Sequence, residues 1–325
     1  MGSRGTRPGQ FNRPSGLALT PDDAFVLVVD TGNRRVVVLR ATDGAWVRQL
    51  MGPPGTLQYP VGVAVVPSMG QVLVSDIDRN QVIQFQSIED DSVVGTLGTG
   101  AGSGPTQFQR PRGLVVLDGS CCPPVWLSYQ CCSDTMINLP TIRALQLVVV
   151  LFSLQEGPVA VVADTNNRRL ALWRLHDGTV WKHLGSRGTQ PGQFTNPRAV
   201  AVTGSGALVV TDEHRVQVLT VDGAVLCVID PSAVAGVGRL GLNLCSVAVF
   251  PGTNEILVTD YQNHRVVALT CTSDWSALVD ARAWGSRGNQ LGQLDYPVGI
   301  VVTAAGAVWV AELVNDRLSL MHWLV

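Results

Sequence analysis

Short apolar runs separated by polar turns make up most of the chain. In its opening stretch the runs are Gly16–Leu19, Phe25–Val29, Val36–Leu39 and Trp46–Leu50. They are rich in Val and Leu and have lengths typical of strands, whereas a helix needs a longer segment. Gly, Pro, Asp and Asn, which favour turns, lie between them. The pattern therefore predicts four consecutive strands.

The same four-strand unit recurs along the sequence. It begins with Gly-Ser-Arg-Gly at Gly2, Gly185 and Gly285, and its second strand ends in an acid. Six copies align through these acids, which are Asp30, Asp76, Asp164, Asp212, Asp260 and Glu312. Four-stranded units of this period are typical of propeller blades, and closing them into a ring removes exposed sheet edges. We therefore predict an all-β fold, a six-bladed β-propeller.

The propeller is expected to be a single domain over residues 1–325. Its blades are expected at approximately 2–50, 51–97, 98–184, 185–229, 230–284 and 285–325. The innermost strands are predicted at Leu17–Leu19, Val63–Val66, Leu114–Leu117, Val200–Val202, Val247–Phe250 and Ile300–Val302. Leu318–Val325 supplies a third strand to the last blade and no apolar run follows it in this sequence. The last blade is therefore predicted to have three strands, and the alternative is that the chain is a fragment of a longer protein.

An insertion, residues 120–156, interrupts the third blade. Joining Asp118-Gly119 to Gly157-Pro158 restores the repeat, so the intervening residues are extra. The insertion carries four cysteines without the C-x-x-C spacing that is usual for zinc, namely Cys121, Cys122, Cys131 and Cys132. Its Leu-Phe-Ser-Leu-Gln end is what a translated intron boundary would give. We expect it to be disordered or an artefact of the gene model.

Two short motifs recur at fixed places in the copies. A P-x-G motif opens the innermost strand at Pro14, Pro60, Pro111 and Pro297, with Pro197-Arg198-Ala199 slightly altered. A D-x-x-N-x-R motif, or its Glu form, starts at Asp30, Asp164, Asp260 and Glu312. Together they resemble the NHL-repeat family, as in the NHL domains of TRIM-NHL-type proteins, over nearly the whole chain. Blades 2, 4 and 5 depart from the motifs and are expected to be less regular.

The acid and arginine of the second motif are expected to be structural. An Asp or Asn closes an Asx-type turn, and an Arg can join a carboxylate to free backbone carbonyls. The turn staples predicted in this way are the pairs Asp30 and Arg35, Asp164 and Arg169, Asp260 and Arg265, and Glu312 and Arg317. An alternative is a ring of carboxylates that holds a cation at the axis.

The charges are distributed unevenly if the fold is correct. The net charge of −2 is small, but in a propeller the loops between blades share one side with the turns between the second and third strands of each blade. That side carries seventeen arginines and eleven acids, a surplus of six positive charges. An arginine-rich surface is suited to phosphate or acidic peptide, because the guanidinium presents a planar fork.

We therefore expect a non-enzymatic binding platform that holds a protein or peptide on this side. Single-stranded RNA is the alternative ligand for the same surface. The candidate binding residues are Arg7, Arg34, Arg79, Arg112, Arg168, Arg198, Tyr261 and His264. Phe11, Phe108 and Phe194 are expected to fill the core instead. DNA and membranes are not expected as partners, and the domain is expected to be monomeric.

A second alternative is a metal-dependent enzyme of the lyase or lactonase type, because NHL-like propellers include such enzymes. Their metal sites need ligands that converge at the axis. The five histidines do not share a repeat position, and no hydrolase or phosphate-binding motif is present. We therefore expect no catalytic residues, no metal and no cofactor. Without a signal peptide or disulfide pattern, a cytoplasmic location is the default expectation.

Overall fold

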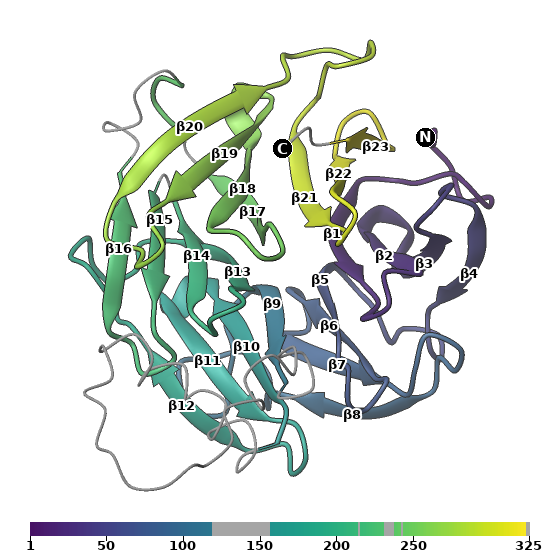
Figure 1. Cartoon of the computed structure of the whole chain (residues 1–325). Helices are drawn as coiled ribbons and strands as arrows, with labels where there is room; N and C mark the ends of the chain where they lie inside the picture. The colour runs from purple at the N-terminus through teal and green to yellow at the C-terminus, as the bar shows by residue number, and fades with distance from the viewer. Residues whose placement is uncertain (119–156, 214, 231–236, 242, 323–325) are drawn as a thin grey trace, which may run out of the picture.

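The strands form six small sheets arranged around a central axis (Figure 1). The computed structural model describes residues 1–118, 157–213, 215–230, 237–241 and 243–322. Five sheets have four strands, and the last, β21 to β23, has three. The predicted six-bladed propeller with a three-stranded last blade is thus confirmed. The insertion at 120–156 and its four cysteines lie outside the described residues.

Each blade is an antiparallel meander whose first strand lies at the axis. Blade 1 contains β1 (Pro14–Leu19), β2 (Phe25–Asp30), β3 (Arg35–Arg40) and β4 (Trp46–Leu50). Blade 2 contains β5 (Pro60–Val65), β6 (Val72–Asp76), β7 (Gln81–Phe85) and β8 (Val93–Leu97). Blade 3 contains β9 (Pro111–Leu117), β10 (Val159–Asp164), β11 (Arg169–Arg174) and β12 (Val180–Leu184).

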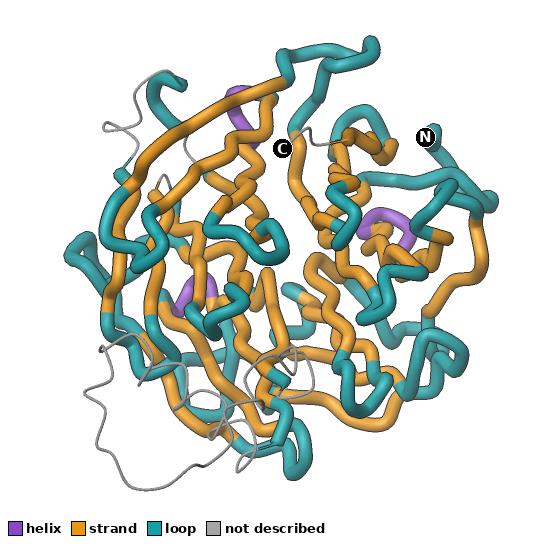
Figure 2. Tube along the Cα trace, viewed as in Figure 1, coloured by secondary structure: helices purple, strands orange, loops and turns teal. Residues whose placement is uncertain are grey.

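The second half of the ring follows the same order. Blade 4 contains β13 (Pro197–Val202), β14 (Leu208–Asp212), β15 (Arg215–Leu219) and β16 (Val225–Ile229). Blade 5 contains β17 (Leu244–Val249), β18 (Glu255–Asp260), β19 (Arg265–Cys271) and β20 (Leu278–Trp284). Blade 6 contains β21 (Pro297–Val302), β22 (Ala307–Glu312) and β23 (Arg317–His322). The helices drawn in Figure 2 are single 3₁₀ turns, η1 (Thr31–Asn33), η4 (Thr165–Asn167) and η6 (Tyr261–Asn263). None of the described segments is a helix long and apolar enough to cross a membrane.

The hydrophobic core lies between blades. Every one of the six buried clusters joins two neighbouring blades, and one of them joins blade 6 to blade 1 through Trp309, Phe11 and Leu17. Phe108 and Phe194 fill the same position in their own blades and are fully buried, as the sequence predicts. Burial of apolar area between each pair of sheets is what closes the ring.

The glycine of the P-x-G motif is required by close approach of the next blade. A Cβ atom on Gly16 would lie 2.4 Å from the carbonyl oxygen of Val61, and one on Gly299 would lie 2.0 Å from that of Ser15. Real Cβ atoms do not approach so closely, so a side chain would force the inner strands apart. Because the innermost strands pack so closely, the middle residue of each P-x-G motif is held at one end of the axial space.

Candidate functional site

The turn staples join the loop that enters each blade to the turn after its second strand. Arg35 donates from Nε to Asp30 at 2.7 Å, and its terminal nitrogens donate to the carbonyl oxygens of Thr6 and Gln10. Asp30 also accepts from the backbone N–H of Asn12 at 2.7 Å. Burial raises the pKa of Asp30, and these hydrogen bonds oppose the rise. The arginine therefore serves the architecture of the blade.

The other predicted pairs have the same geometry. The Nε to carboxylate distance is 2.8 Å for Arg169 with Asp164, 2.8 Å for Arg265 with Asp260 and 2.6 Å for Arg317 with Glu312. Blade 4, whose motif is shorter, still pairs Arg215 with Asp212 at 3.1 Å. Sequence reasoning missed that pair because the regular spacing is absent. The signal available was Arg215 at the start of the third strand, where every stapled blade carries an arginine.

Blade 2 has the acid without the arginine. Asp76 is fully buried and accepts hydrogen bonds from the backbone N–H groups of Gln58 and Tyr59. Gln81 occupies the arginine position and donates to the carbonyl oxygen of Gly98 at 3.0 Å. The acid alone is thus sufficient to organise the loop, and the arginine adds a second set of contacts.

The hydrogen bonds of the staples place the loops between blades and the turns after the second strands on the same side of the ring. We call this side the basic face and define it by its seventeen arginines. Six of them pair with described carboxylates, which are the five staples and Arg287 with Asp295 at 3.7 Å. The eleven that form no ion pair with a described residue are Arg4, Arg7, Arg13, Arg34, Arg79, Arg110, Arg112, Arg168, Arg187, Arg198 and Arg239.

Burial separates the two signs of charge on the basic face. Six of its eleven acids are fully buried at the ends of the second strands, where they accept backbone hydrogen bonds. These six are Asp30, Asp76, Asp164, Asp212, Asp260 and Glu312. Arg7 and Arg34, by contrast, are exposed. Five of the buried acids neutralise the staple arginines, so the other twelve arginines of the face are accompanied by only five less-buried acids.

The remaining candidate residues differ in accessibility. Arg79 and Arg168 are half-buried and donate to the carbonyl oxygens of Gly55 and Asn166. Tyr261 is half-buried, and its ring centroid lies 4.6 Å from that of Tyr296.

His264 is not the surface group that the sequence suggested. His264 is only 8% exposed, because its ring packs against Tyr296 of the next blade, with the ring centroids 4.4 Å apart. Its Nδ1 accepts from the backbone N–H of Tyr296 at 3.2 Å and lies 3.0 Å from the Asp295 carboxylate. His264 therefore joins blades 5 and 6 and does not contact a ligand on the outer surface.

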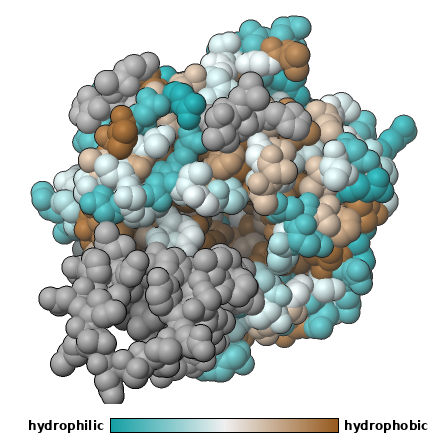
Figure 3. All heavy atoms as spheres, viewed as in Figure 1, coloured by the Kyte–Doolittle hydropathy of each residue, from teal (hydrophilic) through white to brown (hydrophobic). Residues whose placement is uncertain are grey.

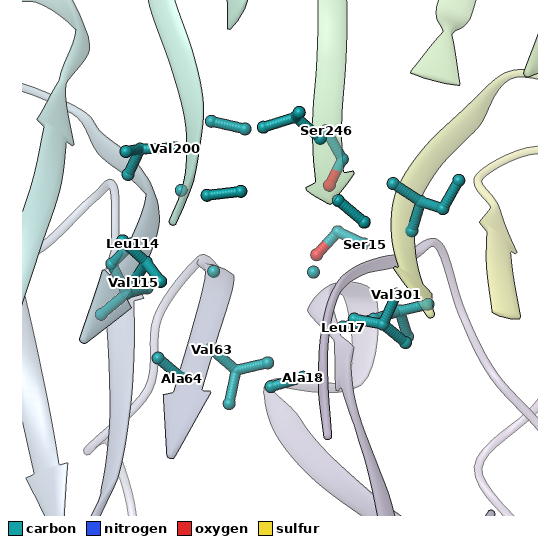
Figure 4. A pocket seen from close by; sticks show the side chains of 18 of the residues that line it. Ser15, Leu17, Ala18, Val63, Ala64, Leu114, Val115, Val200, Ser246 and Val301 are labelled. Carbon is teal, nitrogen blue, oxygen red and sulfur yellow. The ribbon is translucent and has the colours of Figure 1, made fainter. Parts of the chain in front are cut away.

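An axial cavity of about 590 Å³ opens at the centre of the ring. Its wall is made by the innermost strands of all six blades, and Figure 4 shows side chains such as Val63, Leu114 and Val200 around the central space. In Figure 3 hydrophobic atoms are visible around the hollow in the middle of the ring. The charged residues of its lining are Arg13, Arg112 and Arg198, so every charge there is positive.

Arg112 and Arg198 occupy the middle position of the P-x-G motif in neighbouring blades. Cys245 occupies the same position in blade 5, and the equivalents in blades 1 and 2 are Ser15 and Val61. The sequence singled out both arginines but missed Cys245, because blade 5 has no proline or glycine to mark the motif. Three neighbouring blades therefore contribute polar groups to one side of the mouth of the cavity.

The like charges of Arg112 and Arg198 repel each other at the mouth of the cavity. Burial and the nearby charge of Arg198 lower the pKa of Arg112 to about 10. Within the described part of the chain, the Arg112 guanidinium has no hydrogen-bond partner and no ion pair. Arg198 donates to Asn243 at 2.8 Å and lies 3.5 Å from the Cys245 sulfur, while its Nε is buried and has no partner among the described residues. Burial raises the pKa of the Cys245 thiol, which donates to the Asn243 carbonyl oxygen.

No cluster of three or more potential metal ligands occurs among the described residues. His176, His183 and His264 lie in three separate places, and His214 is outside the described residues. A metal enzyme of this architecture would need ligands that converge at the axis, and no histidine is among the described residues that line the cavity.

Comparison with known proteins identifies one of the repeats directly. The family model of the NHL repeat matches residues 57–85, which run from the loop before blade 2 to the end of β7. No curated protein matches the sequence.

Among solved structures, the fold is similar to the hydrazine synthase of Kuenenia stuttgartiensis. The TM-score is 0.59 at 12% identity, over 99% of each chain. It is also similar to a streptogramin B lyase, with a TM-score of 0.53 at 12% identity, over 98% of this chain and 96% of that one. At this identity the likeness concerns the fold.

Proposed function

Since the chain is an NHL-repeat β-propeller, we propose that it is a non-enzymatic platform that binds an acidic protein segment on its basic face. The observation that carries the proposal is the separation of charge within that face. Six of the eleven acids are buried, five of them in staples, whereas eleven arginines have no described carboxylate partner. An extended acidic segment would supply carboxylates to several of these guanidinium groups at once.

The distribution of the arginines without a described carboxylate partner favours a polymer over a small ligand on this surface. The exposed Arg7 and Arg34 belong to blade 1, whereas the exposed Arg110 and the half-buried Arg168 belong to blade 3, so the positive groups lie on different sectors of the ring. A peptide that crosses the face can contact several sectors. Each exposed contact is weak by itself, because solvent screens it, and affinity requires several together.

The positions of the aromatic residues favour a protein ligand over an RNA ligand for the basic face. Proteins that hold single-stranded RNA without base pairing use exposed aromatic rings as stacking platforms. On the basic face, Tyr261 packs on Tyr296, and Phe11, Phe108 and Phe194 are buried in the core. The described part of the face therefore offers many charges but few free rings, which suits carboxylates better than bases.

The proposal is tested with a fourfold variant in which Arg7, Arg34, Arg110 and Arg168 are each replaced by Gln. None of these is a staple, so the fold should be retained. The matched control replaces Arg40, Arg48, Arg174 and Lys182, which lie outside the face, by Gln. Both variants and the parent are used as baits, and an acidic segment of a recovered partner is then synthesised and titrated.

The affinity for that segment should fall at least about tenfold in the fourfold variant and change less than about twofold in the control. Binding that is unaffected by the fourfold change would refute the proposal. A single-stranded uridine decamer is titrated in parallel over a range of salt concentrations. If it binds more tightly than any acidic segment, with affinity falling steeply as salt rises, RNA is the ligand of this face.

A further inference from the structure

We propose that the axial cavity is a second binding site, which takes a small amphipathic carboxylate. The anionic head would lie between Arg112 and Arg198 at the mouth, and the hydrocarbon tail would run along the ring axis. This site is separate from the exposed arginines of the proposed function. It rests on the unpaired charges at the mouth and on the composition of the wall.

The positive charges of Arg112 and Arg198 at the mouth of the cavity favour the binding of an anion. A buried charge without a counterion is costly, and two like charges on neighbouring strands increase that cost. In the staples of this same protein, each buried arginine has a carboxylate within 3.1 Å. Arg112 has no described partner, and the described partners of Arg198 are neutral. A bound carboxylate would supply the missing negative charge and accept hydrogen bonds from the Arg112 guanidinium, which has no described partner.

The apolar wall of the cavity favours the binding of a hydrocarbon chain. Leu19, Val65, Val115, Ala248 and Val301 line the cavity from five different blades, and all are half-buried, so each keeps part of its apolar surface open to the cavity. Apart from arginine, the lining contains no charged residue among those described. An inorganic anion would pair with the arginines at the mouth but would leave the apolar wall in contact with water. An aliphatic chain would pack on the wall and remove it from water.

The volume suits a ligand of moderate size. Cavities of about 300–1,000 Å³ that are mainly apolar with a few convergent polar groups are typical of small-molecule sites. The axial cavity, at about 590 Å³, falls within this range. Figure 4 shows the side chains of Ser15 and Ser246 beside the central space on the side opposite Leu114 and Val115. Ser15 already bonds Thr31 and the Val61 carbonyl oxygen, so Ser246 is the hydroxyl more available to a ligand.

The site is tested by titrating the purified chain with decanoate, 1-decanol and acetate in a calorimeter. Decanoate should bind at least about tenfold more tightly than either of the others, because only decanoate uses both the mouth and the wall. Replacing Arg112 and Arg198 together by Met should lower the affinity for decanoate at least about tenfold and leave the affinity for 1-decanol nearly unchanged. The matched control is Arg110→Met, which removes a neighbouring arginine outside the cavity lining and should preserve decanoate affinity within about twofold.

A second variant tests the wall from another blade. Ala248→Trp enlarges a half-buried side chain of the cavity lining without altering any arginine, and it should abolish decanoate binding. Thermal melting of each variant shows whether it is folded. Absence of decanoate binding to the folded parent, or decanoate affinity unchanged in the Arg112 and Arg198 double variant, overturns the proposal. Acetate binding as tightly as decanoate overturns the amphipathic ligand class. None of these outcomes bears on the acidic segment, which uses other arginines.

Discussion

Arginines in the turns and arginines at the axial mouth share one face of the ring but differ in every contact. In the turns, Arg35 and Arg169 are held by buried carboxylates and backbone carbonyl oxygens. At the mouth, Arg112 and Arg198 have only neutral partners or none among the described residues. The comparison teaches that a surplus of arginine does not by itself define a binding surface. The buried carboxylates determine which arginines are already paired within the protein.

The largest effect is expected from breaking a staple. Asp164→Ala should lower the free energy of unfolding by about 3–5 kcal/mol, because it leaves Arg169 without its buried partner and also frees backbone groups. Urea denaturation measures the change. The matched control is Asp43→Ala, which breaks the exposed pair with Arg40 and should cost at most about 1 kcal/mol. Equal losses in the two variants would show that the staple is not a structural element.

An effect of opposite sign is expected at the mouth. Arg112→Met should raise the free energy of unfolding by about 1–3 kcal/mol, because it removes a buried charge that has no described partner. The native pKa of about 10 is below the ordinary 12.5, so the unfolded state binds the additional proton between these values.

The stability of the parent should therefore increase as pH rises through that window, and the advantage of the variant should shrink. Denaturation at pH 9 and pH 11 measures both stabilities. If Arg112→Met destabilises the ring, Arg112 has a structural role that the described contacts do not show.

The smallest effect concerns blade 2, which lacks a staple arginine. Gln81→Arg places an arginine at the position that Arg35 occupies in blade 1, next to the buried Asp76. It should raise the free energy of unfolding by about 0.5–1.5 kcal/mol, since an added hydrogen bond to a buried carboxylate stabilises by roughly this amount. Chemical denaturation provides the measurement. A decrease would mean that the hydrogen bond from Gln81 to Gly98 contributes more than a new staple would.

Much of the basic face could be anticipated from the repeat, but the accessibility of its side chains could not. The spacing from Asp30 to Arg35 is local, so the pair can be recognised from the sequence alone. His264 occupies the same turn position as Arg34 and Arg168, yet it is buried against Tyr296. That contact comes from the next blade, and no pattern within one repeat predicts it.

The sequence by itself determined the blades, their number and the three-stranded last sheet, because strands, turns and close glycines are set by residues within one repeat. Only the tertiary structure decided that Arg112, Arg198 and Cys245 meet at one mouth. They are far apart in the chain and belong to three blades, so their proximity requires the ring to close. Closure itself depends on apolar packing between blades, and it creates the axial cavity.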